Sequence, residues 1–199
     1  MAEQSFRLIL ASASPRRREL LAQAGYSFEV HAADIDESQR AGESPSAYVL
    51  RLAEEKAHAV LSKHTDQTDL IVLGADTTVV LDDTILGKPA DAADAREMLR
   101  RLSGRTHQVL TGIAAATRAG ISTAVESTDV TFSEIPEAEL DAYCATSEPL
   151  DKAGAYGIQG YAARWIPCID GCYFNVMGLP IARTVRLIKE AARGSYRHA

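Results

Sequence analysis

The spacing of apolar positions predicts that strands and helices alternate along the first half of the chain. Short apolar or alternating runs predict strands, and apolar residues recurring every three or four positions predict helices. By these criteria the expected strands are residues 6–11, 26–32, 69–73, 78–81 and 85–89. The expected helices are residues 15–24, 45–64 and 91–102, each with a helix-starting serine, proline or aspartate at its beginning.

Hairpin signals dominate the second half of the chain. We expect strands at 107–116 and 122–132, helices at 136–144 and 179–192, and no regular element in the glycine-rich stretch 150–161. Asp170-Gly171 is a dipeptide typical of two-residue hairpins, so 164–169 and 172–176 are expected to pair as strands. This order favours an α/β or mixed α+β fold with a largely continuous twisted sheet. Residues 1–199 are expected to form a single domain, with two lobes around a cleft as its internal division.

Composition narrows the class of protein. The 199 residues carry 21 basic and 27 acidic side chains, a net charge of −6, which argues against general binding of nucleic acid. No apolar run approaches the roughly 20 residues that a membrane helix needs. The first residues lack a basic segment followed by a long apolar one, so we expect no secretion signal. Three cysteines in such a chain indicate reduced thiols and a cytoplasmic protein.

The stretch SASPRRR, residues 12–18, combines a turn with a helix start. Ser14 is a good N-cap, and Pro15 suits the first helical position. The unpaired N–H groups of the first turn, the hydroxyls of Ser12 and Ser14, and the guanidinium groups of Arg16 and Arg17 together suit a polyphosphate. The alternative is an ordinary helix cap followed by a solvated basic face.

Two carboxylates are candidates for binding a metal or activating water. Asp76 follows an apolar run beside Gly74, and ligands of open α/β sheets bind at the carboxyl ends of strands. There it could hold Mg²⁺ or orient a water, or it could serve only as a turn or cap residue. Glu37, in the acidic segment 34–37, is a second candidate ligand, with a solvated surface carboxylate as its alternative.

Two lysines and a glutamine complete the candidate set. Lys88 lies between Gly87 and Pro89, where its side chain must project, and is the better phosphate ligand of the two lysines. Lys56 could equally be a salt-bridged residue on a helix surface. Gln159 offers a donor and an acceptor on one planar amide in a loop whose glycines allow close approach of a ligand. Together these residues indicate metal-assisted cleavage of a nucleoside polyphosphate.

Several segments also resemble one known family. SASPRRRELL resembles the signature S-x-S-P-R-R of the Maf family of nucleotide pyrophosphatases, and the likeness continues, in order and at the expected spacing, through ESPSAYVLRLAEEKA, GADTTVVLDDTILGKP, LSGRTHQVLTG, SEPLDKAGAYGIQG and NVMGLPI. It covers nearly the whole chain. The resemblance implies an elongated α/β fold with a mixed twisted sheet, flanking helices and a central cleft, similar to that of inosine triphosphate pyrophosphatases. It also implies a cytoplasmic enzyme, often a homodimer, that uses a divalent metal, Mg²⁺ or Mn²⁺, to hydrolyse nucleoside triphosphates to monophosphate and pyrophosphate.

The resemblance also implies roles for single residues. Asp76 matches the catalytic acidic residue and, with Glu37, a metal ligand. Phosphate-site positions of the family match Arg17, Lys56 and Lys88, and positions associated with substrate choice match Arg16, Thr77 and Gln159. Arg-Arg after the proline, Ala-Asp-Thr and Ile-Gln-Gly are typical of the subgroup acting on dTTP and UTP. The alternatives are a 7-methyl-GTP pyrophosphatase, whose subgroup differs at these places, and a nucleotide-binding regulator of cell division.

Overall fold

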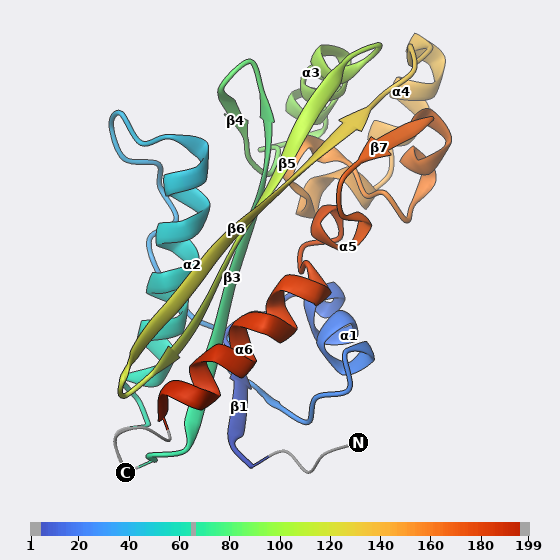
Figure 1. Ribbon diagram of the computed structural model, residues 1–199. Coiled ribbons are helices and arrows are strands. Elements are labelled where there is room, and N and C mark those ends of the chain that lie inside the picture. Colours follow the sequence, from blue (N-terminus) through green and yellow to red (C-terminus); the bar gives the residue numbers. More distant parts are fainter. Residues whose placement is uncertain (1–4, 65–66, 196–199) are drawn as a thin grey trace.

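A mixed sheet of seven strands runs through the whole length of the molecule, with helices on both of its faces (Figure 1). The structure is a computed structural model and describes residues 5–64 and 67–195. Its strand order is β2-β1-β3-β5-β6-β7, and β4 pairs with β3 outside this order. β1 is parallel to β2 and β3, whereas all other pairs are antiparallel. The strands are β1 Arg7–Leu10, β2 Glu29–Val30, β3 Leu70–Leu81, β4 Thr84–Leu86, β5 Thr106–Thr117, β6 Gly120–Thr131 and β7 Cys168–Asp170.

The longer helices begin at the residues that the sequence predicts. Side chains of Ser14, Ser44 and Asp91 each accept a backbone N–H from the first turn of the helix that follows. The helices are α1 Pro15–Gln23, α2 Pro45–Leu61, α3 Ala92–Leu102, α4 Glu137–Cys144, α5 Tyr173–Val176 and α6 Ile181–Ser195, with short 3-10 helices at Glu148–Asp151, Ala153–Ala155 and Tyr161–Trp165. Within the described residues, no helix is both long and apolar enough to cross a membrane.

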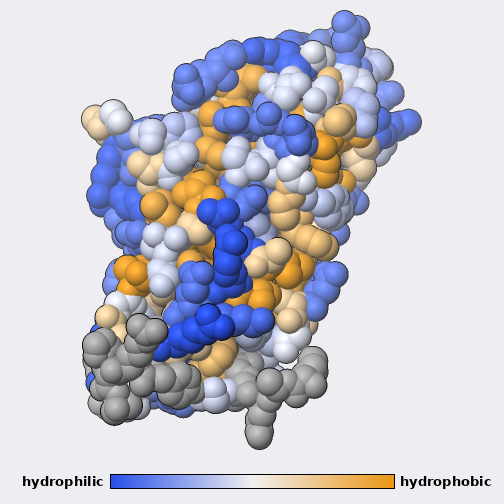
Figure 2. All heavy atoms as spheres, in the orientation of Figure 1, coloured by the Kyte–Doolittle hydropathy of each residue, from blue (hydrophilic) through white to orange (hydrophobic). Residues whose placement is uncertain are grey.

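Alternate residues of the central strands face different helices. Successive side chains of a strand point to opposite faces of the sheet. On one face, Leu70 and Val72 of β3 join an apolar cluster with Ala53 and Val60 of α2. On the other face a second cluster joins β3 to α1 and α6, with members Ile71, Leu73, Leu20, Leu21, Leu187 and Ile188. The outer side of α6 forms the hydrophilic band in the middle of Figure 2.

Two glycines let α2 pack its backbone directly on the sheet. A Cβ atom at Gly74 of β3 would clash with the carbonyl oxygen of Ala53, and one at Gly112 of β5 would clash with that of Val49. Only glycine permits so close an approach of two backbones. The path of α2 over β3 and β5 is therefore fixed at two points, one of them three residues before Lys56.

A separate apolar cluster fills the far end of the sheet, under α3 and α4 (Figure 1). Phe132 and Trp165 belong to it, and their rings meet at a steep angle. His107 is buried there, and its Nε2 lies 2.8 Å from the hydroxyl of Tyr156. None of the members of this cluster belongs to α1, α2 or α6.

The prediction of a mixed α/β fold with flanking helices is confirmed, but several predicted strands are wrong. Segments 69–73 and 78–81 belong to one twelve-residue strand, β3, because residues 72–80 pair without interruption with β5. The predicted strand 26–32 shrinks to Glu29–Val30, since only these residues pair with β1. Segment 85–89 pairs only at Thr84–Leu86.

The predicted hairpin around Asp170-Gly171 is also wrong. Segment 164–169 contributes the end of a 3-10 helix and part of β7, and 172–176 contains α5. The cause is tertiary. The N–H of Cys172 donates to the hydroxyl of Thr128 in β6, and the buried amide of Asn175 donates to Thr128 and to the carbonyl of Val109. These contacts are made by a helical turn lying across β5 and β6.

Candidate active site

The candidate residues surround an unpaired stretch on the outer edge of β3. β5 occupies one edge of β3 along residues 72–80. On the other edge β1 pairs with Leu70–Leu73 and β4 pairs with Val79–Leu81, so no described strand pairs with 74–78 there. The prediction that Asp76 follows the end of its strand is thus wrong, since it lies in the middle of β3. Asp76 nevertheless lies just beyond the carboxyl end of the parallel neighbour, β1.

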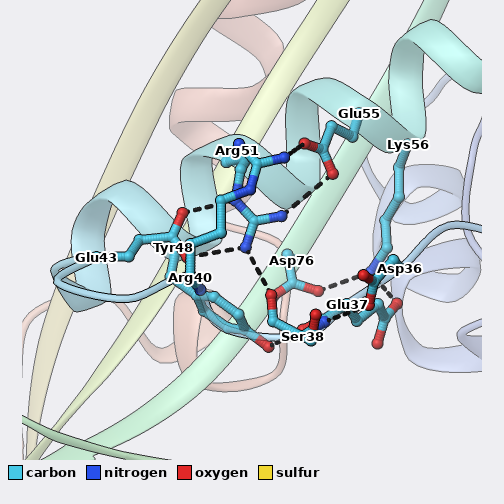
Figure 3. Close-up of polar contacts among 10 residues, drawn as sticks. All are labelled: Asp36, Glu37, Ser38, Arg40, Glu43, Tyr48, Arg51, Glu55, Lys56 and Asp76. Atoms are coloured by element: carbon cyan, nitrogen blue, oxygen red, sulfur yellow. Dashed lines mark hydrogen bonds and ion pairs between the residues drawn. The ribbon is translucent and has the colours of Figure 1, made fainter.

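Lys56 joins the two predicted metal ligands, as Figure 3 shows. Its Nζ lies 2.7 Å from Oδ1 of Asp76 and 2.6 Å from Oε1 of Glu37. The side chains of Lys56 and Asp76 are 9% and 11% exposed, whereas that of Glu37 is 51% exposed. Three charged groups from α2, β3 and the loop before α2 therefore meet at one place, with Glu37 on the solvent side.

The charges around Glu37 favour its ionised form. Partial burial works toward a higher pKa, but the hydrogen bond and charge of Lys56, followed by the charges of Lys88 and Arg17, hold the pKa of Glu37 below its ordinary value. Glu37 is therefore a carboxylate at neutral pH. The same influence shows that Lys88 and Arg17 lie close enough to act on this group electrostatically.

Arg17 is held on the opposite face of β3. Its guanidinium donates to the carbonyl oxygen of Gly178 at 2.9 Å, to the hydroxyl of Thr77 at 2.9 Å and to that of Ser12 at 3.3 Å. Burial lowers the pKa of Arg17, while the charge of Asp76 acts against this shift. Since arginine stays protonated in proteins, a positive charge is fixed here. Asp76 and Thr77 are consecutive in β3, so the unpaired edge lies between a carboxylate–lysine cluster and an arginine–hydroxyl cluster.

The remaining candidate residues near this edge differ in their contacts and in their exposure to solvent. Ser14 caps α1, and its N–H donates to the hydroxyl of Ser12 at 3.2 Å. Lys88 is exposed in the loop after β4. Arg16 is half-buried, and after Lys152 its charge helps to offset the burial of Asp151, whose pKa is lowered.

Gln159 lies in an exposed turn. Its neighbour Ile158 packs against the apolar cluster shared by α1, β3 and α6. None of the described contacts joins Gln159 directly to Arg17, Thr77 or Asp76. The structure thus brings Ile158, the neighbour of Gln159, to the face of the sheet on which Arg17 lies, and leaves Gln159 itself exposed.

Sequence reasoning misses the residues that hold this site in shape. The hydroxyl of Thr77 lies 2.9 Å from that of Thr111 in β5, which in turn donates to the carbonyl oxygen of Asn175 at 3.2 Å. Arg51 and Tyr48 of α2 bind the loop that carries Glu37. Thr111 could have been noticed as a hydroxyl inside an apolar run, but the partners of Arg51 and Tyr48 become visible only in three dimensions.

The donor set fits a magnesium or manganese ion bound together with phosphate. Within residues 5–64 and 67–195 no three histidine, cysteine, aspartate or glutamate side chains gather as a metal cage. Mg²⁺, however, is commonly bound through one or two carboxylates together with waters and substrate phosphates. Asp76 and Glu37, both in contact with the ammonium of Lys56, supply these two carboxylates.

A family model and curated relatives place the chain in one family. A family model described as Maf-like protein matches residues 7–191. A dTTP/UTP pyrophosphatase of Hahella chejuensis is 51% identical over 184 residues, 92% of each chain, and one of Bacillus cytotoxicus is 51% identical over 95% of this chain and 97% of its own. Among solved structures, a nucleoside-triphosphatase, or dITP/XTP pyrophosphatase, of Mycobacterium abscessus has 16% identity and a TM-score of 0.43 over 79% of this chain and 93% of its own.

Proposed function

Because the chain belongs to the Maf family, we propose that it is a dTTP/UTP pyrophosphatase, an enzyme that hydrolyses these nucleotides to the monophosphate and pyrophosphate. The observation that carries the proposal is the Lys56 ammonium bound to both Asp76 and Glu37 beside the fixed charge of Arg17. This arrangement supplies both signs of charge within one small site. It suits a substrate that is polyanionic and that is cleaved by water.

Binding of the triphosphate is assigned to the basic groups at the edge of β3. Arginine has five N–H donors. Three donors of Arg17 point to Gly178, Thr77 and Ser12, so two remain for phosphate oxygens. Lys56 and Lys88 add positive charge from the other side of the strand. The turn at Ser12 and Ser14 and the N-terminal end of α1 offer further N–H groups to an anion.

Asp76 is assigned to the attacking water. It accepts or orients the water's proton while the water oxygen forms a bond to the α-phosphorus, and the bond from that phosphorus to the bridging oxygen breaks. Pyrophosphate leaves with the bridging oxygen. A divalent ion held by Asp76 and Glu37 would supply neutralisation of the charge on the phosphates. Lys56 keeps both carboxylates close together.

Product analysis across a panel of nucleotides tests the proposal. dTTP, UTP, CTP and 7-methyl-GTP are incubated with the protein and Mn²⁺ or Mg²⁺, and pyrophosphate and orthophosphate are quantified separately. The proposal expects pyrophosphate from dTTP and UTP and loss of turnover with a chelator. Release of orthophosphate overturns the mechanism, preference for 7-methyl-GTP overturns the substrate assignment, and tight binding without turnover favours the regulator of cell division.

The proposal also includes the cellular setting implied by the family. We assign the chain to the cytoplasm, as a homodimer of a single domain that comprises residues 1–199. The continuous sheet from β1 to β7 and the family match over residues 7–191 support the single domain. Sedimentation equilibrium tests the homodimer, and fractionation of cells tests the location.

A further inference from the structure

The loop that carries Glu37 is bound to α2. We call residues 36–43 the Glu37 loop. Arg51 of α2 holds both oxygens of Glu43 at the end of this loop, with Nε 2.6 Å from Oε1 and Nη2 2.8 Å from Oε2 (Figure 3). Nη2 of Arg51 also donates to the carbonyl oxygen of Ser38 at 3.0 Å. The side chain of Arg51 therefore binds the loop near its start, at Ser38, and at its end, at Glu43.

Tyr48 makes a second hydrogen bond between α2 and the loop, directly to Glu37. Its hydroxyl donates to the carbonyl oxygen of Glu37 at 2.9 Å. Tyr48 and Arg51 are three apart on α2, so they lie on neighbouring positions of one helix side. Lys56, further along the same helix, contacts the carboxylate of Glu37. The main chain and the side chain of Glu37 are thus both bound from α2.

The Arg51–Glu43 pair is stronger than an ordinary surface ion pair. Its side chains are 12% and 9% exposed, and a two-point arginine–carboxylate contact is geometrically specific. Hydrogen bonding from Arg51 lowers the pKa of Glu43 to about 2. Within the loop, Glu43 also accepts from the N–H of Arg40, and its carbonyl accepts from the amide of Gln39. Glu43 consequently links the folded loop to the helix.

Helix α2 is itself fixed on the strand that carries Asp76. Gly74 and Gly112 hold its backbone against β3 and β5, and this contact sets the position of Lys56 over Asp76. Asp76 reaches the site from the sheet, whereas Glu37 reaches it only through the loop that Tyr48 and Arg51 hold. The two carboxylates therefore depend on different supports.

We propose that Arg51 and Tyr48 are positioning residues that place Glu37 against Lys56 and so complete the two-carboxylate site. The inference deepens the proposed function and rests on it. Loss of either residue is expected to act on Glu37 and to leave Asp76 in place. The effect should therefore fall on the binding of the divalent ion and much less on kcat at saturating metal.

Three substitutions and a matched control test this assignment. Arg51→Met removes the hydrogen bonds and ion pair to the loop, and Arg51→Lys keeps the charge without the two-point contact. Tyr48→Phe removes only the hydroxyl. Arg96→Met is the control, because Arg96 also pairs with two carboxylates, those of Glu137 and Asp141, but on the surface between α3 and α4, away from the site. Pyrophosphate release is measured against Mn²⁺ concentration, and Mn²⁺ binding without nucleotide is measured by electron paramagnetic resonance.

In Arg51→Met, the Mn²⁺ concentration needed for half-maximal rate and the Kd for Mn²⁺ should both rise about tenfold or more. Losses of this size are typical when a residue that orients a metal ligand is removed. Arg51→Lys and Tyr48→Phe should show smaller rises and Arg96→Met none. In a Glu37→Gln background, Arg51→Met should add less than about a further twofold, because the residue that it positions no longer acts as a ligand.

Amide hydrogen exchange gives a readout that does not depend on turnover. Exchange across the Glu37 loop should accelerate in Arg51→Met, while exchange in β3 stays unchanged. Accelerated exchange with an unaltered Kd for Mn²⁺ overturns the positioning role, as does a rise in Kd that persists in full in the Glu37→Gln background. If the unmutated protein bound Mn²⁺ through Glu37 but hydrolysed no nucleotide, the proposed function would fail while the positioning role stood. If Arg51→Met fails to fold, Glu43→Gln replaces it with the same expectations.

Discussion

Nζ of Lys56 and Oδ1 of Asp76 form an ion pair of 2.7 Å in which neither side chain is more than 11% exposed. Removing two charges from water is costly, and a buried ion pair is weak evidence for added stability. Glu37 offsets the cost in part as a second partner of the ammonium. Such a cluster, placed beside an unpaired strand edge, is better explained by a reaction than by the stability of the fold.

Substituting Asp76 tests its catalytic assignment. Asp76→Asn keeps the shape of the side chain but removes the base, so kcat for dTTP should fall by about 100-fold or more. Because Lys56 keeps Glu37 as a partner, the thermal midpoint should change little compared with the loss of rate. Steady-state pyrophosphate release and thermal melts of the same preparation measure both. A variant that retains a tenth of the normal kcat would contradict the assignment of Asp76 as general base.

Substituting Lys56 should raise the pKa of Glu37. Burial of Glu37 favours its neutral form, and the hydrogen bond and charge of Lys56 are the first influences that oppose it. In Lys56→Met the carboxyl should therefore begin to take up a proton at higher pH than in the unmutated protein. Carbon NMR titration of the glutamate carboxyls measures this without reference to activity. Lys88→Met is the control, with a smaller shift in the same direction, since the charge of Lys88 acts more weakly than that of Lys56.

Gly74→Ala should damage the site through the fold. The added methyl group would clash with the backbone of α2 at Ala53 and Ala57, so helix and strand must separate and carry Lys56 away from Asp76. Overpacking of this kind typically costs about 1–3 kcal/mol or more in the free energy of unfolding. Gly194→Ala is the matched control, because open space surrounds that position in α6. Urea denaturation and pyrophosphate release should both report the difference. Equal stability of the two variants would show that α2 does not pack on β3 so closely.

His107 should make the protein less stable as pH falls below 6.5. Burial lowers the pKa of His107 from 6.5 to about 4, so between these values the unfolded chain binds a proton that the folded one excludes. The free energy of unfolding is then expected to decrease toward acid by up to about 1.4 kcal/mol per pH unit from this group. The double substitution His107→Phe and Tyr156→Phe removes the titrating ring and its hydroxyl partner together. Urea denaturation from pH 4 to 7 should show a shallower slope for that double variant, and an unchanged slope would refute this origin.

The local signals in the sequence are sufficient to locate the helix starts. They also single out the two carboxylates and the lysine that the structure brings together, whose roles stay predictions. Ser14 and Ser44 cap helices as expected, because capping depends on residues three positions apart. The pairing of strands was harder to predict. The sequence predicts that Asp76 follows a strand, because Gly74 interrupts the apolar run, but β3 continues through Gly74, where the missing side chain admits α2. That reason lies in Ala53, 21 positions earlier in the chain.

The supports of the site could not be predicted for the same reason. Arg51 and Glu43 are eight positions apart across a helix start, and neither spacing nor composition distinguishes them from exposed charges. The helical turn at Tyr173–Val176 depends on Asn175 reaching β5 and β6 with its amide. Side chains whose function is to join distant segments carry no signal within their own segment.

Gln159 is expected to select the base of the nucleotide. Uracil and thymine present acceptor O2, donor N3–H and acceptor O4, and one glutamine amide can accept from N3–H while it donates to O4. Gln159 is exposed, but the turn that carries it packs tightly on Glu148. The packing at Gly160 is so close that an added Cβ would clash with the carboxylate of Glu148. The same carboxylate accepts the N–H of Tyr161 at 3.2 Å. The backbone is therefore held, and the exposed amide is expected to take one orientation when a base binds.

Cytosine reverses the pattern at N3 and C4, so an amide held in the orientation that fits uracil would be left unpaired by it, whereas the methyl group of thymine changes binding by only about 1–3 kcal/mol. We expect dTTP and UTP to be turned over well and CTP and 7-methyl-GTP poorly. Gln159→Ala should reduce this preference more than it lowers the maximal rate. Gln159→Glu keeps an acceptor for N3–H but loses the donor to O4, and should lower kcat/KM for UTP without raising that for CTP. The kcat/KM values of the three proteins on all four nucleotides decide the matter, and CTP hydrolysed as well as UTP by the unmutated protein would refute recognition through the amide.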